Sequence, residues 1–582
     1  MGVTGMRVPR KEDPRLLRGR GAFADGFHAR GELWARIVRS PVAHGTVRAV
    51  DVQAARRAGG VAAVVTAADL PPGLAIPVRL ALRGLPLTDF LQPVLAAGVV
   101  RYVGEPLAVV VARDAYAAED AAELVDLDIE PLPAVLDAAA AAGDGAAGDG
   151  AAGDGAAGEG APRLFPAGNV AADVTLDYGD TEAAFARAAH VAEAEIEIGR
   201  HTGVPLEPRA LLAEPDPRTG GLSITGMTKV PVFNRDVLAA MLGIDETLIH
   251  VRAIDAGGGF GVRGEFYPED YLVPWLARTL GRPVKWAEDR AEHLVAVNHS
   301  RQQVHRIRAA FDAHGRILAL ADDILHDNGA YCRTHGITVP ELTVAMLPGP
   351  YRVPAFRGRI RVLLTNKTPC GTYRAPGRFE GSTAREQLLD MAAGQLGIGR
   401  AELRRRNLLR PDELPCRRPL RTLGTDVVLD AGDYPALLAA AQAEAVRLGY
   451  PALVARERAA GRRCGLGLAV FLEKSGLGPQ ETADVLVSKT GTVHVYSGGT
   501  SLGQGIETVL AQIAADALGV DLGTVRVVNG DTALQPFGSG SWASRSTVVG
   551  GNAVHAAATA VAARARQLAA RKIGRASCRE RV

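Results

Sequence analysis

The sequence predicts a mixed α/β and α+β fold divided over several domains, and three observations favour this prediction. The chain has 582 residues, of which 47% are hydrophobic and 22% charged, enough to fill more than one hydrophobic core. Short apolar runs of strand length alternate with segments of helical spacing. A stretch rich in alanine and glycine at residues 141–160 interrupts this alternation, and it has no bulky apolar side chain with which to build a core.

Residues 15–137 are predicted to form a compact α/β module of alternating short strands and helices. Its predicted strands are residues 32–39, 61–66 and 106–112. Residues 114–124 have helical spacing, with Ala117, Ala121 and Leu124 on one apolar stripe.

A flexible linker is predicted at residues 138–163. Four tandem pentapeptides fill most of it, three of sequence Ala-Ala-Gly-Asp-Gly and one of sequence Ala-Ala-Gly-Glu-Gly. Such a composition cannot bury enough apolar surface to fold, so we expect a domain boundary here.

Residues 164–410 are predicted to form a second domain that mixes strands and helices. Its predicted strands are residues 191–198 and the two arms of a hairpin at 301–327, which turns at 312–315. Its predicted helices are residues 234–242 and 380–396. Asn234 is placed as the N-cap of the first helix and Gly397 as the stop of the second.

Residues 425–571 are predicted to form a third domain. Its predicted strands are residues 464–472, 482–488 and 492–496. Its predicted helices are residues 433–448, a helix that opens at 501–505 and runs to 518, and residues 553–570.

The last eleven residues, 572–582, do not fit this pattern. They resemble a translated sequencing adapter and abruptly end an alanine-rich helix, so we exclude them from the fold as a non-native tail. We expect the natural chain to continue past residue 571, and the third domain to be incomplete in this sequence.

A run of glycines, Asp255-Ala-Gly-Gly-Gly-Phe-Gly261, carries the strongest local signal for a site. Glycine destabilises helix and strand interiors by roughly 0.5–1 kcal/mol each, so the run requires a close approach of the backbone to something else. It is either a tight buried turn or a place where backbone N–H groups reach an anionic or oxo group. A second glycine turn, Gly503-Gln504-Gly505, precedes a predicted helix, and it is either an anion site or an ordinary strand–helix turn.

Composition and missing motifs exclude several classes of protein. The net charge of +2 does not indicate the strongly basic surface that is typical of nucleic-acid binding. The sequence contains no run of 18 apolar residues, so no membrane span is predicted. The N-terminus has no apolar signal segment, so we expect a cytoplasmic protein. None of the five cysteines has C-x₂-C spacing, and no phosphate-binding or dinucleotide fingerprint stands out. In a redox enzyme, flavin and iron–sulfur clusters would therefore be bound by other chains.

Seven short patterns occur in a characteristic order. The glycine run is followed by Tyr373-Arg374-Ala-Pro-Gly-Arg-Phe-Glu380, by Gly503-Gln504-Gly505, and by residues 530–546, which contain Ala543-Ser544-Arg545. Three patterns precede it: Arg39-Ser-Pro-Val-Ala-His44, Tyr102-Val-Gly-Glu-Pro106 and Leu206-Glu-Pro-Arg209. This succession resembles the molybdenum-binding large subunit of the xanthine dehydrogenase/aldehyde oxidase family, over nearly all of residues 15–571.

The resemblance implies a fold and a set of cofactors. Residues 15–137 would be the family's α/β hammerhead domain, 164–410 the first molybdopterin-binding domain, and 425–571 an incomplete second one. The implied cofactor is a molybdenum–molybdopterin, in bacterial relatives usually the cytosine dinucleotide form, and its dithiolene rather than a side chain holds the metal. FAD and [2Fe–2S] clusters are implied on partner subunits, a FAD-binding medium subunit and an iron–sulfur small subunit.

The resemblance also implies roles for individual residues. Gly259, Phe260 and Gly261, with Gly258 before them, match the backbone that lies against the metal's oxo ligand, and Arg374 matches an arginine near the metal. Leu502, Gly503, Gln504 and Gly505 match the turn that binds the pterin. Ala543, Ser544 and Arg545 match the segment beside the pterin phosphate and the nucleotide, where an arginine can bind a phosphate with two hydrogen bonds.

The implied reaction is hydroxylation of an aldehyde or an N-heterocycle with oxygen taken from water, and electrons leave through the iron–sulfur and FAD subunits. The family's general base is a glutamate in a Gly-Glu-Pro-Pro-like loop, and no such loop follows residue 546. We therefore expect this chain to be inactive alone. The alternatives are a non-catalytic cofactor-binding or assembly homologue of the same fold, and an unrelated α/β binding protein in which the glycine motifs are mere turns.

Departures from the family pattern narrow the substrate. Xanthine enzymes carry a glutamate where this chain has Gly264, although Glu265 follows directly, and their substrate arginine and sandwiching phenylalanine correspond to Leu342 and Pro376. Loss of these groups disfavours xanthine, because a polar heterocycle is discriminated by hydrogen bonds. Carbon monoxide dehydrogenases place a copper-binding cysteine at the position of Ala375, which disfavours CO oxidation.

Lys229 is the most unusual departure. Relatives have Thr-Gln before a proline, with the glutamine near the metal's oxo group, whereas this chain has Thr228-Lys229-Val-Pro231. An ammonium donates hydrogen bonds but adds a charge. Lys229 is therefore a candidate catalytic residue beside Arg374, or else a solvated lysine that turns away from the site.

Overall fold

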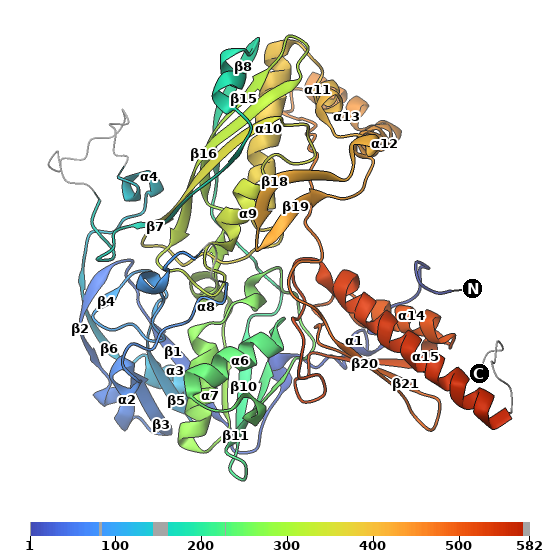
Figure 1. The fold of residues 1–582 in the computed structure, drawn as a ribbon. Coiled ribbons are helices and arrows are strands. Elements are labelled where there is room, and N and C mark those ends of the chain that lie inside the picture. The colour runs from blue at the N-terminus through green and yellow to red at the C-terminus, as the bar shows by residue number, and fades with distance from the viewer. Residues whose placement is uncertain (1, 81–83, 144–160, 227, 574–582) are drawn as a thin grey trace.

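The computed structural model describes residues 2–80, 84–143, 161–226 and 228–573 (Figure 1). It confirms the predicted mixture of α/β and α+β units. The pentapeptide repeats from residue 144 to 160 lie outside the described residues, as does the predicted non-native tail from residue 574 onward. Three main sheets and the helices packed on them make up most of the described chain.

The largest sheet has seven strands and joins the N-terminal region to the region that follows the linker. Its strands, in spatial order, are β12 (Ile249–Arg252), β11 (Gly221–Gly226), β10 (Ala210–Asp216), β13 (Val284–Ala287), β1 (Leu33–Arg39), β5 (Pro106–Ala112) and β3 (Val61–Thr66). Strands β1 and β13 pair in parallel, so residues 15–137 share one sheet with residues 210–287. The boundary placed at residues 138–163 remains a prediction.

Two hydrophobic clusters explain why β5 is a continuous apolar run. Val109 and Val111 face one cluster together with helices α6 (Pro231–Leu242) and α7 (Pro268–Leu280). Val110 faces the other, beside α2 (Gln53–Arg57) and α3 (Ala115–Ala122). A strand buried on both faces needs no polar residue in either phase of its alternation. A small antiparallel sheet lies alongside, formed by β4 (Val99–Val100), β2 (Gly45–Asp51) and β6 (Asp126–Pro131).

A five-stranded sheet forms the upper part of the molecule in Figure 1. Its strands, in spatial order, are β7 (Val170–Tyr178), β17 (Ala355–Leu364), β16 (Ile317–Gly329), β15 (Gln303–Phe311) and β8 (His190–Ile198). The helices of this part are α5 (Thr181–Ala186), α9 (Thr338–Met346), α10 (Arg378–Leu396) and α11 (Arg400–Asn407). The long helix α10 packs on the sheet, and together they contribute much of the largest hydrophobic cluster.

The C-terminal unit has a three-stranded sheet covered by two helices. Its strands are β20 (Ala483–Val487), β21 (Val493–Ser497) and β22 (Val525–Asn529), and its helices are α14 (Ile506–Leu518) and α15 (Asn552–Ile573). The remaining short elements are α1 (Asp13–Leu16), α4 (Ala138–Ala141), β9 (His201–Thr202), α8 (Arg290–Ala296), β14 (His299–Ser300), β18 (Cys416–Thr422), β19 (Thr425–Leu429), α12 (Tyr434–Arg447) and α13 (Tyr450–Ala459).

The strand predicted at residues 464–472 is wrong. These residues form no ladder, because side chains of α10 and α11 bind their backbone instead of a neighbouring strand. Arg385 and Arg404 donate to the carbonyls of Val470 and Leu468, at 2.8 and 3.0 Å, and Glu386 accepts from the Val470 N–H at 3.0 Å. The backbone is satisfied without a sheet, which sequence periodicity cannot reveal.

Three local predictions are also corrected. Helix α6 begins at Pro231, with Val230 as its N-cap, so Asn234 is a buried position inside the helix and not its cap. A proline in the first turn sets the start because its missing N–H needs no partner there. In α3 the buried residues are Ala118 and Ala121, while Leu124 is exposed.

The third correction concerns the linker, whose first residues, 138–141, form the helix α4 with Asp137 as its cap. The hairpin turning at 312–315 and the stop of α10 at Gly397, which is left-handed with φ 65°, are confirmed. Within the described part of the chain, no helix is both long and apolar enough to cross a membrane.

Candidate functional site

The glycine run and the segment around Arg374 lie directly against each other. The Arg374 N–H donates to the Phe260 carbonyl at 2.7 Å. A Cβ atom at Gly261, whose φ is 124°, would lie 2.2 Å from the carbonyl oxygen of Thr372. The close backbone approach predicted for this run is therefore made in part to another segment of the same chain, and only glycine fits.

The two C-terminal segments reach the same place. A Cβ atom at Gly259 would contact the Leu502 side chain at 3.1 Å. Lys229 joins the remaining pieces through its backbone. Its N–H donates to Arg263 at 3.1 Å, and its carbonyl accepts from the Ser541 N–H at 2.9 Å and from the Thr500 hydroxyl at 3.2 Å. Segments around residues 229, 260, 374, 502 and 541 thus converge, although more than 300 residues separate the first from the last.

Left-handed backbone concentrates at this point. Among the described residues, six non-glycine residues have positive φ, and four of them lie in the converging segments: Phe260, Ala375, Ala543 and Ser544, with φ between 45° and 59°. Such conformations cost about 1–3 kcal/mol each and persist only where the surroundings enforce them. Their clustering indicates a functional site and not a set of ordinary turns.

Arg374 is presented at the surface of this convergence. Its side chain is exposed and makes no hydrogen bond or ion pair within the part of the chain that the structure describes. Its backbone, by contrast, is fixed at both ends, by Phe260 and by Arg301, which donates to the Arg374 carbonyl. A held backbone with a free guanidinium is suited to binding a ligand.

Arg301 is a buried residue that holds the segment around Arg374 in place, and this role was not predicted from the sequence. It has a φ of 79°, and its guanidinium lies 4.6 Å from the centre of the Tyr373 ring and 4.4 Å from that of the Phe379 ring. It also pairs with the buried carboxylate of Glu380 at 3.1 Å. An arginine at a strand junction carries no sequence signal for this role, because its partners lie more than 70 residues away.

Arg301→Ala is expected to destabilise the protein by about 3–5 kcal/mol, because the change leaves Glu380 buried without a partner. Arg306→Ala is the matched control, since Arg306 pairs with Glu195 on the surface, where both side chains are more than half exposed, and such pairs contribute about 0–1 kcal/mol. Urea unfolding of both variants measures the difference. Equal midpoints for the two variants would contradict the role of Arg301.

The turn at Gly503–Gly505 leads from β21 into α14, with φ values of 88° and 79° at its two glycines. Gln504 does not extend its amide away from this turn. The amide accepts from the Leu502 N–H at 2.5 Å and donates to the Thr500 carbonyl at 2.9 Å, so it stabilises its own loop. The groups left for a ligand are therefore backbone groups at the helix start.

The N-terminal arm holds this turn from outside. Arg10 donates to the Gly503 carbonyl at 3.0 Å, and Arg15 pairs with Asp255 at the start of the glycine run. Further along α14, the Glu12 carboxylate accepts from the Thr508 hydroxyl at 2.5 Å. The arm therefore ties the C-terminal unit to the glycine run, and no pattern in the sequence predicted this.

Arg545 lies deeper than predicted. Its guanidinium is buried, pairs with Glu481 at 3.0 Å, donates to the Pro479 carbonyl and lies over the Trp542 ring. The residues before it, Ala543 and Ser544, are two successive left-handed residues, an arrangement that turns neighbouring N–H groups toward one side. The Arg545 N–H closes this turn by donating to the Trp542 carbonyl at 3.1 Å, so the N–H groups that remain for an anion are those of Ala543 and Ser544.

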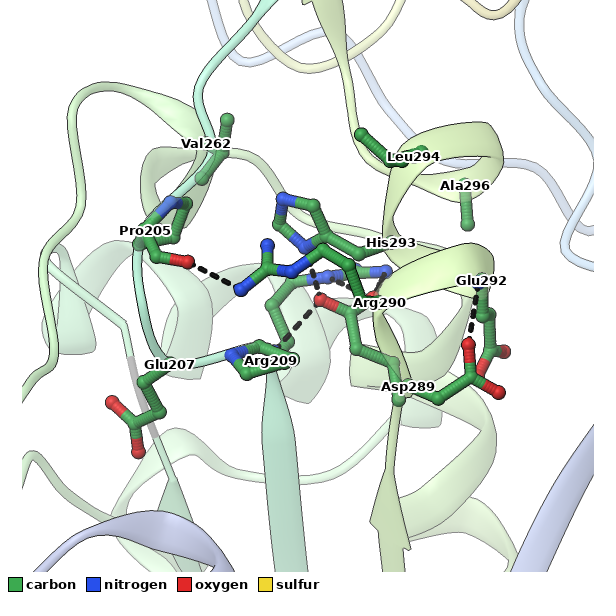
Figure 2. A network of polar contacts seen from close by, with 12 residues as sticks. Pro205, Glu207, Arg209, Val262, Asp289, Arg290, Glu292, His293, Leu294 and Ala296 are labelled. Carbon is green, nitrogen blue, oxygen red and sulfur yellow. Dashed lines mark hydrogen bonds and ion pairs between the residues drawn. The ribbon is translucent and has the colours of Figure 1, made fainter.

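The loop at residues 203–209 contacts the glycine run and holds its start in place. The Gly257 N–H donates to Glu207 at 2.8 Å. The loop is bound by a polar network, part of which Figure 2 shows. Arg290 donates to the Pro205 carbonyl at 2.6 Å, and Arg209 pairs with the buried Glu288 at 2.7 Å. Figure 2 places His293 in the same network.

His293 links this network to the loop. It contacts Glu288 through Nδ1 at 2.5 Å and the Gly203 carbonyl through Nε2 at 3.0 Å. Burial raises the pKa of Glu288, but Arg209 and His293 outweigh this effect and hold the pKa at about 2. The network therefore remains charged at neutral pH and fixes the loop that fixes the glycine run.

Comparisons with known proteins agree with this geometry. The chain matches the α/β hammerhead domain of aldehyde oxidase and xanthine dehydrogenase over residues 18–133, and the molybdopterin cofactor-binding domain over residues 164–408 and 445–579. It is 42% identical to the 6-hydroxypseudooxynicotine dehydrogenase complex subunit gamma of Paenarthrobacter nicotinovorans, over 97% of this chain and 70% of the relative. This chain belongs to the xanthine dehydrogenase/aldehyde oxidase family. The resemblance predicted from its motifs is confirmed, and the chain is a molybdenum hydroxylase large subunit.

Two further comparisons place this large subunit within the family. It is 36% identical to the nicotine 6-hydroxylase large subunit of the same organism, over 96% of this chain and 68% of the relative. The crystal structure of quinoline 2-oxidoreductase from Pseudomonas putida 86 superposes with a TM-score of 0.89 at 36% identity, covering 98% of this chain and 72% of that one. The third domain match extends to residue 579, into the tail predicted as non-native.

The residues of the large subunit fit a molybdopterin. The convergence offers a narrow glycine-lined backbone, a helix start, a pair of left-handed residues and the free guanidinium of Arg374. These are donors suited to a phosphate-bearing group whose metal is held by its own dithiolene. The assignment of individual residues to parts of the cofactor remains a prediction.

Proposed function

We propose that this large subunit binds a molybdenum–molybdopterin between its converging segments and hydroxylates an N-heteroaromatic ring with oxygen taken from water. The observation that carries the proposal is the meeting of the segments around Phe260, Arg374, Leu502 and Ala543 at one site. The substrate class is supported by the similar proteins named above, whose names refer to nicotine, hydroxypseudooxynicotine and quinoline. The absence of purine-binding groups at Gly264, Leu342 and Pro376 supports it too.

In this proposal, the residues of this chain bind the cofactor and orient the substrate beside it. When bound, the molybdenum cofactor supplies the oxidising centre for oxygen transfer to an electron-poor carbon. The glycines at 258, 259 and 261 let this segment pack closely against Pro205, Leu502 and Thr372, which fixes its backbone beside that group, and Arg374 offers a positive charge there. Phe260 is 45% exposed and provides an apolar surface against which a planar ring can lie.

The finer assignments belong to the same proposal. Leu502 to Gly505 bind the pterin, and the backbone of Ala543, Ser544 and Arg545 binds the phosphate of a cytosine dinucleotide form. A FAD-binding medium subunit and a [2Fe–2S] small subunit take up the electrons, in the cytoplasm. CO oxidation is disfavoured because Ala375 occupies the place of the cysteine that CO dehydrogenases require there.

The test uses the natural full-length large subunit assembled with its flavin and iron–sulfur subunits. We expect about one molybdenum per assembly and turnover of quinoline- or pyridine-type compounds, with ¹⁸O from labelled water in the product. Xanthine and CO serve as control substrates, and benzaldehyde tests the aldehyde alternative. An assembly without molybdenum contradicts the proposal. Bound molybdenum without turnover of any compound favours the non-catalytic homologue instead.

A further inference from the structure

The side chain of Lys229 lies across the backbone of Gly264. A Cβ atom at Gly264 would come within 2.1 Å of the Lys229 Cε and 2.8 Å of its Nζ. Glycine at this position thus provides the space that the lysine occupies. Lys229 is 7% exposed, so the alternative of a solvated lysine that turns away from the site is not what the structure shows.

The ammonium of Lys229 has no acceptor within the residues that the structure describes. Its backbone hydrogen bonds are all accounted for, but no hydrogen bond or ion pair involves Nζ. The Lys229 side chain is mostly buried, but its Nζ is not fully enclosed by protein atoms. Proteins normally pair an ammonium in such a place with an acceptor. The arrangement therefore points to an acceptor that a ligand brings.

The charges around Lys229 do not supply that acceptor. Glu265 is the carboxylate whose charge acts on Lys229. Its Oε1 is bound by His335 and by the Thr372 N–H, and its Oε2 is buried without a hydrogen-bond partner but makes no hydrogen bond or ion pair with the ammonium. Arg79 lies on the same side, where it donates to the Gly264 carbonyl at 3.2 Å and contacts His335 at 2.9 Å. At neutral pH, the cations Lys229 and Arg79 and a histidine thus face a single carboxylate, so the surroundings favour a further negative group.

We propose that Lys229 is a specificity-determining residue, whose ammonium binds a negatively polarised oxygen of the ligand in the site, with Gly264 providing the necessary room. The inference rests on the proposed function and narrows its substrate to N-heteroaromatic compounds that carry a carbonyl, phenolate or carboxylate oxygen. The same chemistry could also be met by an oxo group of the cofactor, and the test separates these two sources.

The protonation of Lys229 sets the pH range of this contact. Burial lowers the pKa of its ammonium to about 8; the attraction of Glu265 opposes this shift, and Arg79 adds to it. Burial acts against ionisation of Glu265 too, but His335 and nearby arginines outweigh it and hold the pKa of Glu265 at about 2. Lys229 is therefore charged below pH 8 and neutral above it, while Glu265 stays ionised throughout.

The main experiment compares wild type, Lys229→Gln and Lys229→Met in the assembled enzyme. For each we would measure kcat/KM for a hydroxyquinoline and for unsubstituted quinoline. The ratio of the two values is expected to fall at least tenfold in both variants. In wild type the KM for the oxygen-bearing substrate rises above pH 8, and in the variants this rise is absent. The control is Lys489→Gln, an exposed lysine in the C-terminal unit, whose ratio stays that of wild type.

Gly264→Ala provides an independent variant. Its methyl group displaces the Lys229 side chain, so we expect the same loss of selectivity, and no additional loss in the Gly264→Ala/Lys229→Gln double variant. Thermal unfolding checks folding, and the midpoint of Lys229→Met is expected to be no lower than that of wild type, because the change removes an unpartnered buried cation.

The molybdenum EPR spectrum of the substrate-free enzyme shows whether the oxygen that Lys229 binds belongs to the substrate or to the cofactor. An unchanged spectrum with a changed substrate ratio places the oxygen on the substrate. A changed spectrum with equal losses for both substrates places it on the cofactor. Wild-type ratios and spectra in both Lys229 variants overturn the inference. A wild-type assembly without molybdenum or turnover refutes the proposed function instead, and this outcome is seen before any variant is made.

Discussion

Arg374→Ala is expected to lower the turnover of the assembled enzyme by about 100-fold or more while leaving the fold intact. The guanidinium is exposed and has no partner among the described residues, so its loss removes no contact that stabilises the chain. The backbone of the residue stays fixed by Phe260 and Arg301, so the loop keeps its shape. Removal of one fixed donor at a reacting centre commonly costs about 100-fold or more in rate.

The control for this variant is Arg187→Ala, an exposed arginine at the end of α5. Steady-state kinetics would be measured together with circular dichroism and molybdenum content. Wild-type turnover in Arg374→Ala would remove this residue from the site. A loss of turnover with a matching loss of molybdenum would assign it to cofactor binding and not to the reaction.

Gly261→Ala is expected to prevent the site from forming. A Cβ atom there would lie 2.2 Å from the Thr372 carbonyl and 2.9 Å from the Tyr373 Cα, and the φ of 124° is strained for any residue with a side chain. Neither neighbour can move alone, because the Phe260 carbonyl and the Arg374 N–H are bonded to each other. We expect loss of most bound molybdenum and a destabilisation of about 3 kcal/mol or more, beyond the 1–3 kcal/mol of strain alone.

Gly243→Ala separates strain from steric overlap. Gly243 ends helix α6 with a φ of 64°, and a Cβ atom there would meet nothing within 4 Å. This variant should keep its molybdenum and lose only about 1 kcal/mol of stability. Metal analysis and thermal unfolding of both variants show whether strain alone or the steric overlap accounts for the loss. If Gly261→Ala retained wild-type molybdenum, the close packing of the two loops would not be needed for the site.

Local features were predictable where one residue type has one physical meaning. Gly397 ends α10 because only glycine adopts the left-handed conformation freely, and the helix predicted at 433–448 is observed as α12, where Asp433 is the cap. The strand expected at residues 464–472 failed for the opposite reason. Its apolar pattern is real, but arginines from α10 and α11 satisfy its backbone.

The site was predictable in part. The order of seven motifs indicated the family. The segments that approach each other closely were also recognisable, because close backbone approach requires glycine. Arg301 and the N-terminal arm left no such mark. Their partners lie 70 to 500 residues away along the chain, and neither an arginine nor an extended arm has a local preference that identifies it.

By itself, the sequence of this large subunit indicated the mixed fold class and several of its strands and helices, where the backbone must approach something closely, and to which family the chain belongs. Those properties follow from residue type and spacing. Only the tertiary structure decided that Gln504 is bound within its own loop, that Arg545 pairs with Glu481, and that Lys229 is buried over Gly264 without an acceptor. Whether a polar group is free or paired depends on segments brought together by folding, and for that reason it cannot be read along the chain.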